Sequence, residues 1–460
     1  MAFRKLRNSS LFLTFTTTFN RREEKALGRL TMLASALLAG GFSNLALGGA
    51  LYTAFLTAND FSIVDTGYLT VFSTLASLLM VLFSPILMDK IMRRGKGVKF
   101  FLCGVRLFSY SLSIIGITLI TLYVPDKDTK YFLFVAISFT TTLLNTLVQP
   151  GFTFWHANFI SDEESRTKYM SISQILSSFS SGVTLIISGL IADAVRGTSR
   201  EIPVLCALRV VAFVLLILEI IVLLRPREYP YVTTESKVKI RYIFSIPLRN
   251  KKFMFTMLIM VLWTLSVNIP ATWVYYLINS VEMKITLMNT ADFLYSIVQM
   301  MFMAFTLRFV RKVGWAKSFG IFAVFQGISD ILLSMTGLFP IGFGSAFFFA
   351  MRMIQHVIGV TLNISWANFP YMNTPVENRN YYFSFYYFIT YLFTALGQYL
   401  GTLMVKVMGD TTVRIFGGVL EAPALLKTIS GTVCTVIAVL VLCFWKTLQP
   451  TPEEKEKLEA

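Results

Sequence analysis

Charged side chains are scarce in this sequence, and histidine and cysteine are scarcer still. Of its 460 residues, 14% are charged, four are cysteine and two are histidine. A soluble globular protein carries about 25% charged residues, and a single soluble core stops growing at about 250–300 residues. The composition therefore excludes a water-soluble globular protein. The cysteines lie inside apolar runs without the spacing of metal ligands, so neither a zinc site nor a disulfide framework is expected.

Motifs for catalysis or cofactor binding are also missing. The sequence has no phosphate-binding glycine loop, no zinc signature and no nucleophile elbow at a usable position. It leaves no room for a soluble catalytic or ATP-binding domain. We therefore expect no enzyme activity, no cofactor and no metal site.

Long apolar runs are what the sequence has instead, with 55% of its residues hydrophobic. A helix needs about 20 apolar residues to cross the hydrocarbon core of a bilayer. Candidate spans cover residues 28–56, 66–91, 98–123, 131–157, 167–192, 203–224, 253–279, 286–310, 317–339, 341–368, 380–406 and 422–446. This predicts an all-α polytopic membrane protein with twelve transmembrane helices, surrounded by membrane lipids.

The net charge of +16 is explained by where the cations lie. With the N-terminus placed inside, the inner segments hold 30 of the 41 lysines and arginines, and the outer loops, with Lys427 among them, hold eight. Lysine and arginine concentrate on the cytoplasmic side of membrane proteins. We therefore expect both termini in the cytoplasm, the plasma membrane as the location, and no binding of nucleic acid.

The two halves of the chain carry a similar signature. Trp155 precedes an Ala-Asn-Phe triplet at 157–159 near the end of the fourth span, and Trp366 precedes the same triplet at 367–369 near the end of the tenth. Six spans per unit keep such a repeat parallel. The expected organisation is a cytoplasmic segment at 1–27, a six-helix bundle at 28–224, a cytoplasmic linker at 225–252, a second six-helix bundle at 253–446 and a cytoplasmic tail at 447–460.

This organisation resembles the major facilitator superfamily, and local motifs support the resemblance. Asp89, in the loop after the second span, takes the acidic position of the family's cytoplasmic loop motif, Gly-x-x-x-Asp-Arg-x-Gly-Arg. Arg352 and Gln355 in the tenth span are similar to the arginine-and-glutamine motif of proton-coupled members. Residues 145–167 show a weaker likeness to the sugar:cation symporter branch.

The resemblance implies a secondary transporter, in which two bundles in parallel repeat rock about a site near the bilayer midplane. It also implies that spans 1, 4, 7 and 10 line the path. Asp89, Arg166 and Arg379 lie at cytoplasmic helix ends, where they would close the inner gate through charge and helix-dipole contacts. Solvated loop charges are the alternative for these three residues. We expect a monomer.

The tenth span carries four residues that share one helical face. Arg352, His356, Gly359 and Asn363 are spaced four, three and four residues apart. A charged group at the centre of a span costs about 2.5–3.5 kcal/mol or more. This face is therefore expected to contact protein or a water-filled cavity.

Asp330 is the partner predicted for Arg352. At about 1.5 Å per residue, both lie roughly 15–18 Å below the turn at Pro340. Such a pair could be a static tether between helices, or it could re-form when substrate or a proton binds. His356 could carry a coupling proton, contact the substrate as a neutral ring, or be a satisfied core residue. The candidate coupling residues are Asp330, Arg352 and His356.

Polar side chains at helical spacing mark several other spans, and together they predict a hydrated cavity. Neutral amides and aromatic rings suit a polyol, a sugar or a zwitterion, which needs hydrogen bonds and a stacking surface. The candidate substrate-binding residues are Asn44, Asn145, Gln149, Trp263, Asn268, Tyr295, Gln299, Arg352, His356 and Asn363.

Three further charges lie within spans. Arg209 and Glu219 lie near helix ends, so their side chains are expected to reach the membrane interface. Arg106 lies deeper and is expected to face protein. In the eleventh span, Gly397 and Gly401 form a GxxxG pattern, which allows two helices to approach closely.

The function favoured by these features is secondary active transport of a small polar organic solute, coupled to a gradient of protons or sodium ions. Two alternatives stay open. An exporter of amphipathic compounds would need a more apolar, aromatic cavity, which the abundance of phenylalanine and methionine permits. A transporter-like receptor would bind its ligand without moving it.

Overall fold

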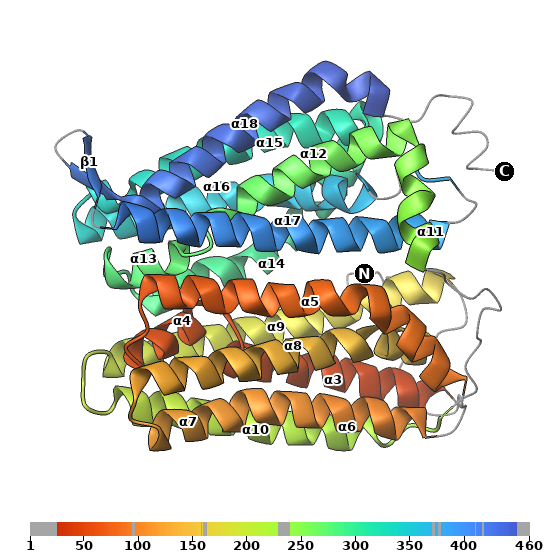
Figure 1. The fold of residues 1–460 in the computed structure, drawn as a ribbon, viewed down its shortest axis with the longest axis horizontal. Coiled ribbons are helices and arrows are strands. Elements are labelled where there is room, and N and C mark those ends of the chain that lie inside the picture. Colours follow the sequence, from red (N-terminus) through yellow and green to blue (C-terminus); the bar gives the residue numbers. More distant parts are fainter. Residues whose placement is uncertain are drawn as a thin grey trace, which may run out of the picture. The chain divides into compact units, whose positions relative to one another are not determined.

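The computed structural model describes residues 25–93, 97–157, 159, 163–228, 240–369, 373–375, 379–409, 411–415 and 418–448. Within these ranges, twelve helical segments are long and apolar enough to cross a membrane. Each overlaps one of the twelve predicted spans, so the prediction of an all-α polytopic membrane protein is confirmed (Figure 1).

The first six spans are built from eight α-helices and one π-helical turn. They are α3 (Ala26–Ala46), α4 (Gly49–Ala58), α5 (Ile63–Met92), α6 (Val98–Ser111), the π-helix η1 (Leu112–Gly116), α7 (Ile117–Tyr123), α8 (Lys127–Ala157), α9 (Glu163–Val195) and α10 (Glu201–Leu223).

The second half of the chain holds the other six spans and, between the last two of them, the only two strands in the described part of the chain. The elements are α11 (Ile240–Ser245), η2 (Pro247–Arg249), α12 (Lys251–Asn268), α13 (Trp273–Asn279), α14 (Ile285–Val313), α15 (Trp315–Ser334), η3 (Met335–Leu338), α16 (Ile341–Asn368), α17 (Arg379–Met408), β1 (Thr412–Ile415), β2 (Gly418–Glu421) and α18 (Ala422–Leu448). The two strands pair antiparallel as a hairpin between α17 and α18.

Short polar residues cap the N-termini of α5 and α8. Before α5, the Ser62 N–H donates to Asp65 Oδ2 at 2.9 Å, and the Asp65 N–H donates to Ser62 Oγ at 3.2 Å, which forms a reciprocal cap. Before α8, Asp126 Oδ2 accepts the Thr129 N–H at 2.8 Å. Hydrogen bonds from the hydroxyl and the N–H of Thr129 lower the pKa of Asp126.

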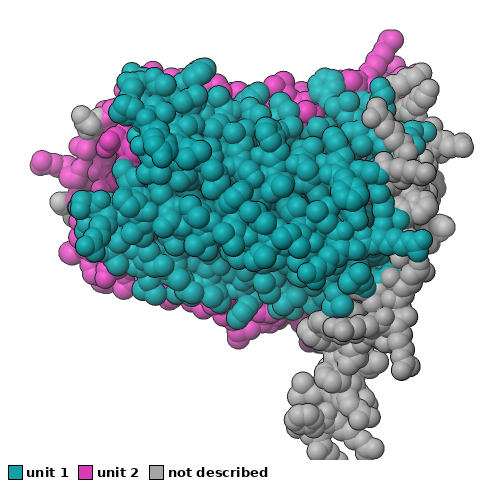
Figure 2. Space-filling view, turned by 90° about the horizontal axis from the view of Figure 1, so that it is seen from below, with its two compact units in different colours: residues 1–55, 83–237 teal, residues 56–82, 238–460 magenta. Residues whose placement is uncertain are grey.

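The chain divides into two compact units, distinguished by colour in Figure 2. Unit 1 comprises residues 1–55 and 83–237, and unit 2 comprises residues 56–82 and 238–460. Most of α5 belongs to unit 2 because it packs against α17. In that contact Thr74 Oγ1 donates to Gln398 Oε1 at 2.7 Å.

The same helix pairs pack together in both units, which bears out the two-repeat arrangement. In unit 1, α3 contacts α9 and α10, while α6 contacts α8 and α10. In unit 2, α12 contacts α17 and α18, while α15 contacts α16 and α18. Counted along the chain, these are the first, third, fourth, fifth and sixth spans of each half, joined in the same combinations.

The first span of each half is also broken into two helices. At the break between α3 and α4, Gly49, the first residue of α4, adopts a φ of +72°, a conformation that residues with a Cβ rarely adopt. Between α12 and α13 the chain passes through Pro270, which cannot donate a backbone hydrogen bond. Different residues therefore interrupt the helix at the equivalent place.

A buried ion pair joins the third and sixth spans of unit 1. Arg106 donates to Glu219 twice, from Nη2 to Oε1 at 2.8 Å and from Nε to Oε2 at 3.0 Å. Ser35 Oγ also donates to Glu219 Oε1 at 2.7 Å. Arg106 faces protein, as predicted. The expectation that Glu219 reaches the membrane interface is wrong, because its fully buried carboxylate is the counter-charge of Arg106.

Arg209 is fully buried as well, so its predicted extension to the interface is wrong. Its guanidinium donates to the carbonyls of Ala46 at 2.7 Å and Ser113 at 2.6 Å, and to Thr118 Oγ1 at 3.1 Å. Ala46 ends α3 and Ser113 lies in the π-helix, two places where carbonyls lack regular helical partners. The guanidinium satisfies those carbonyls and lies 4.6 Å from the ring centre of Phe55.

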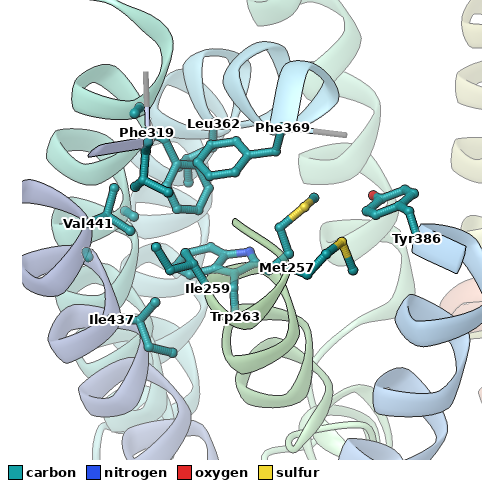
Figure 3. Close-up of a cluster of buried hydrophobic side chains, with 14 of the residues drawn as sticks. Met257, Ile259, Trp263, Phe319, Leu362, Phe369, Tyr386, Ile437 and Val441 are labelled. Carbon is teal, nitrogen blue, oxygen red and sulfur yellow. The ribbon is translucent and has the colours of Figure 1, made fainter. Parts of the chain in front are cut away.

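The core of unit 2 is an aromatic and aliphatic cluster between α12, α15, α16, α17 and α18 (Figure 3). Trp263 contacts Phe319 edge-on, with ring centres 5.0 Å apart, and Phe319 contacts Phe369 at 4.8 Å. Phe369 belongs to the second Ala-Asn-Phe triplet, and its counterpart Phe159 is equally buried in unit 1. The repeated signature thus marks an equivalent core position in each half.

Glycines allow the helices of unit 2 to approach closely. A Cβ placed on Gly397 would lie 2.6 Å from the Leu265 carbonyl, and one on Gly401 would overlap the Ile269 carbonyl, so the predicted GxxxG packs α17 against α12. A Cβ on Gly431 in α18 would lie 2.5 Å from the carbonyl of Gly327 in α15. No larger side chain fits these positions without moving a backbone.

Glu219→Ala is expected to destabilise the protein by about 3–5 kcal/mol, because it leaves the Arg106 guanidinium buried without its counter-charge. Equilibrium unfolding in mixed detergent micelles measures the change. A double variant, Arg106→Met with Glu219→Met, should recover most of the loss because no charge is then stranded. Equal destabilisation in the single and double variants would contradict this account.

Candidate functional site

A pocket of about 430 Å³ lies within unit 2, among α12, α15, α16, α17 and α18. Its wall has an aromatic part, a part of amides and hydroxyls, and an ion pair. The lining residues are Trp263, Thr264, Val267, Asn268, Phe319, Gln326, Asp330, Gly359, Leu362, Asn363, Trp366, Thr390, Thr394 and Lys427. Every one of them belongs to a membrane-length span.

The aromatic part of the wall is formed by Trp263, Phe319 and Trp366. The ring centres of Trp263 and Trp366 are 6.5 Å apart, and Phe319 lies 5.8 Å from Trp366. Leu362 adjoins these rings, and Figure 3 shows it beside Phe319 and above Trp263. This side can hold a planar or apolar group by stacking and dispersion.

Amides and hydroxyls supply the neutral polar part. Asn268 Nδ2 donates to the Thr264 carbonyl at 2.8 Å, one turn back on α12. Asn363 Nδ2 donates to the Tyr295 hydroxyl of α14 at 2.6 Å. With these donors engaged, the Oδ1 atoms of both asparagines are suited to accept hydrogen bonds from a ligand.

Asp330 pairs with Lys427 and not with Arg352, so the predicted Asp330–Arg352 pair is wrong. Lys427 Nζ lies 2.7 Å from Asp330 Oδ1, and the two side chains are only 15% and 5% exposed. Lys427, expected in an outer loop, lies inside α18. The close approach of α15 and α18 at Gly327 and Gly431 brings this lysine within reach of the aspartate.

Gln355 connects Asp330 to Arg352 instead. Its Nε2 donates to Asp330 Oδ1 at 2.8 Å and to Ser329 Oγ at 3.2 Å, while its Oε1 accepts from Arg352 Nη1 at 3.2 Å. The Arg352 guanidinium forms its ion pair with Asp292 of α14. Five polar side chains thus form one chain across α14, α16, α15 and α18.

The polar face of α16, expected to contact protein or a cavity, does both: Arg352 and His356 contact α14, and Gly359 and Asn363 line the pocket. His356 Nε2 donates to the Ala291 carbonyl at 2.8 Å, and its ring centre lies 5.1 Å from that of Tyr295. Gly359 adjoins the same tyrosine, since a Cβ there would lie 3.7 Å from the ring. This buried hydrogen bond favours a satisfied core residue among the three interpretations of His356.

Other predicted site residues lie apart from the pocket. The contacts between α14 and α16 just described involve Tyr295, Arg352 and His356. Gln299 is half-buried on α14. Asn44, Asn145 and Gln149 belong to unit 1. The Asn44 amide donates to the Gly40 carbonyl of its own helix at 2.7 Å. Trp263, Asn268 and Asn363 are therefore the predicted binding residues that meet in one pocket, together with Asp330.

The predicted gate residues are described only in part. Asp89 Oδ2 pairs with Arg93 Nε at 2.8 Å, and both side chains are 41% exposed. Arg166 lies in α9 and Arg379 begins α17, but their side chains fall outside the described part of the chain. Their role in a gate stays a prediction.

Several pocket residues were not predicted from the sequence, namely Lys427, Gln326, Thr390 and Thr394. The threonines had a signal, because a spacing of four residues places both on one face of α17. Lys427 had a weaker signal. It stands one helical turn before Gly431, a small residue that allows a neighbouring helix to approach closely. Among the described residues, no group of three or more histidine, cysteine, aspartate or glutamate side chains could hold a metal ion.

No family model and no curated protein matches the sequence. Solved structures do match. A nucleoside transporter NupG variant matches with a TM-score of 0.67 and 13% identity, covering 91% of this chain and 99% of that one. A D-xylose-proton symporter matches at 0.65 and 14%, covering 93% and 98%. A POT family transporter in complex with 5-aminolevulinic acid matches at 0.62 and 15%, covering 94% and 98%.

At these identities, the likeness establishes the fold. The chain is an integral membrane protein with the twelve-helix fold of the major facilitator superfamily. The fold anticipated from the sequence is therefore confirmed over nearly the whole chain.

Gly431→Leu is expected to destabilise the protein by about 1–3 kcal/mol, because the new side chain would force α18 away from α15. Gly104→Leu is the matched control, since a Cβ at Gly104 meets nothing within 4 Å. Equilibrium unfolding in mixed micelles compares the two variants. Equal effects would show that the close packing of α15 and α18 at Gly431 does not contribute to stability.

Proposed function

We propose that this protein is a secondary transporter that moves a small polar organic solute across the membrane by alternating access. The observation that carries the proposal is the pocket of unit 2, where charges, amides and hydroxyls from five apolar helices meet. Keeping such groups at membrane depth is costly unless water or a ligand solvates them. A protein that only packed its helices would gain nothing from leaving this space unfilled.

The structural neighbours support the same class. NupG is a nucleoside transporter, and the D-xylose symporter couples its sugar to protons. Both carry small polar solutes, and both share the fold of this chain. The mixed lining of the pocket, with indole rings beside amides, suits a solute that has both a flat surface and hydrogen-bonding groups.

A gradient of protons or sodium ions is the proposed driving force. One charge moved through 100 mV supplies about 2.3 kcal/mol, enough to concentrate a solute many-fold. Among the three candidate coupling residues, Asp330 is the one that lines the pocket. Arg352 would act on it through Gln355, and His356 is held by the Ala291 carbonyl.

The remaining features of the proposal come from the sequence. The distribution of lysine and arginine supports cytoplasmic termini and a plasma-membrane location. Asp89, Arg166 and Arg379 would close the inner side, and the protein would act as a monomer. A second candidate, export of amphipathic compounds, is supported by the aromatic part of the pocket wall.

Proteoliposome transport tests the proposal. Purified protein should catalyse uptake or counterflow of at least one labelled solute from a panel of nucleosides, sugars, amino acids and amphipathic dyes. Entry of polar solutes supports the main proposal, and movement of dyes alone supports the exporter. Binding without uptake or counterflow would show that the protein is a receptor and would overturn transport.

Asn363→Ala is expected to lower kcat/KM for the transported solute about tenfold, because a pocket amide is lost. Asn368→Ala is the matched control. It removes an asparagine from the same helix whose amide donates to the Ile364 carbonyl and which does not line the pocket. Its kcat/KM should stay within about twofold of the wild type. Equal losses in both variants would argue against the pocket as the binding site.

A further inference from the structure

The two units carry an ion pair between equivalent spans, but only one of these pairs lines the pocket. Arg106–Glu219 joins the third and sixth spans of unit 1, and Asp330–Lys427 joins the third and sixth spans of unit 2. The first pair is bidentate, and its arginine also lies over three aromatic rings. The second is a single contact at the pocket wall. A helix tether needs no open space beside it, so the second pair calls for another explanation.

The two members of the pocket pair are held unequally. Asp330 Oδ1 also accepts the Gln355 amide at 2.8 Å, and Gln355 is braced in turn by Ser329 and Arg352. The aspartate is therefore fixed. Lys427 reaches the pair through a flexible four-carbon stem, and its ammonium can rotate toward the pocket without disturbing the backbone.

Charge balance decides which solute can use this pair. A neutral solute leaves the pair intact and gains no ionic contact. A solute with a single charge binds one member and strands the other, and stranding one member of a buried pair is strongly unfavourable. A zwitterion offers a carboxylate to Lys427 and an ammonium to Asp330, so that all four charges stay paired.

The rest of the pocket specifies what the zwitterion carries. A volume of about 430 Å³ is at the low end of the range for small-molecule sites, about 300–1,000 Å³. Trp263, Phe319 and Trp366 offer ring surfaces for stacking. Polar substituents can meet the amides of Asn268 and Asn363.

We infer that the pocket binds a zwitterionic amino acid with a planar ring, held by Lys427 and Asp330 at its charged end and by the indoles at its ring. This inference rests on the proposed function, since it names the substrate class of the same site. The ion pair then selects for solutes that carry a positive and a negative charge together.

Binding to the purified full-length protein tests the charge requirement. L-tryptophan, L-tyrosine and L-phenylalanine are compared by calorimetry with their N-acetyl derivatives, which lack the ammonium, and their carboxamides, which lack the carboxylate. At least one parent should bind, and each of its derivatives should bind at least 100-fold more weakly. L-alanine, which has both charges but no ring, should bind at least tenfold more weakly. Derivatives that bind as well as the parent would overturn the inference.

Lys427→Gln should abolish binding of the parent amino acid, whereas Lys406→Gln, at an exposed lysine of α17, should not change it. If Lys427→Gln does not fold, the double variant Asp330→Asn with Lys427→Gln replaces it, because no charge is stranded there. The double variant should bind the parent and its derivatives with equal, weak affinity. A tenfold or greater preference for the parent in the double variant would overturn the inference.

The inference and the proposed function can fail separately. Uptake of a nucleoside or sugar, with no binding of amino acids, would overturn the inference and leave transport standing. Binding of an aromatic zwitterion with the stated charge requirement, but without uptake or counterflow, would support the inference and overturn transport.

Discussion

The rest of this structure depends on the cost of placing a charged or polar group in hydrocarbon without a partner. Each charge found deep in a described span is paired in a specific way. Arg106 pairs with Glu219, Asp330 with Lys427, and Arg209 donates to carbonyls that irregular helical turns leave free. The two ion pairs join the third span to the sixth span in each unit.

Small residues make that pairing possible. Between α15 and α18, Gly327 and Gly431 bring the backbones together, and the Asp330–Lys427 pair lies about one turn away on the same helices. The equivalent helices in unit 1 also hold an ion pair, but there the cation lies on the third span and the anion on the sixth. The repeat therefore preserves which helices are joined, while the side chains that join them, and the space beside them, differ.

The sequence predicted which residues share a helix face better than it predicted what that face contacts. Spacing along α16 correctly placed Arg352, His356 and Asn363 on one face that contacts protein, because helical periodicity is a local property. The partner of Asp330 was wrong because depth alone does not say which way a helix faces. Lys427, which forms the pair, is one of the eight cations that the sequence assigned to outer loops.

The class of structure can be read from the residues alone: twelve apolar spans, a two-fold internal repeat and a set of polar groups that must be hidden from lipid. Those follow from composition and periodicity, which need no knowledge of neighbours. The folded chain was needed to show which polar groups meet, that Gln355 connects two ion pairs, and that residues from five helices enclose one pocket. Such contacts depend on the rotation and separation of helices distant in the chain, and glycines at a few crossing points set both.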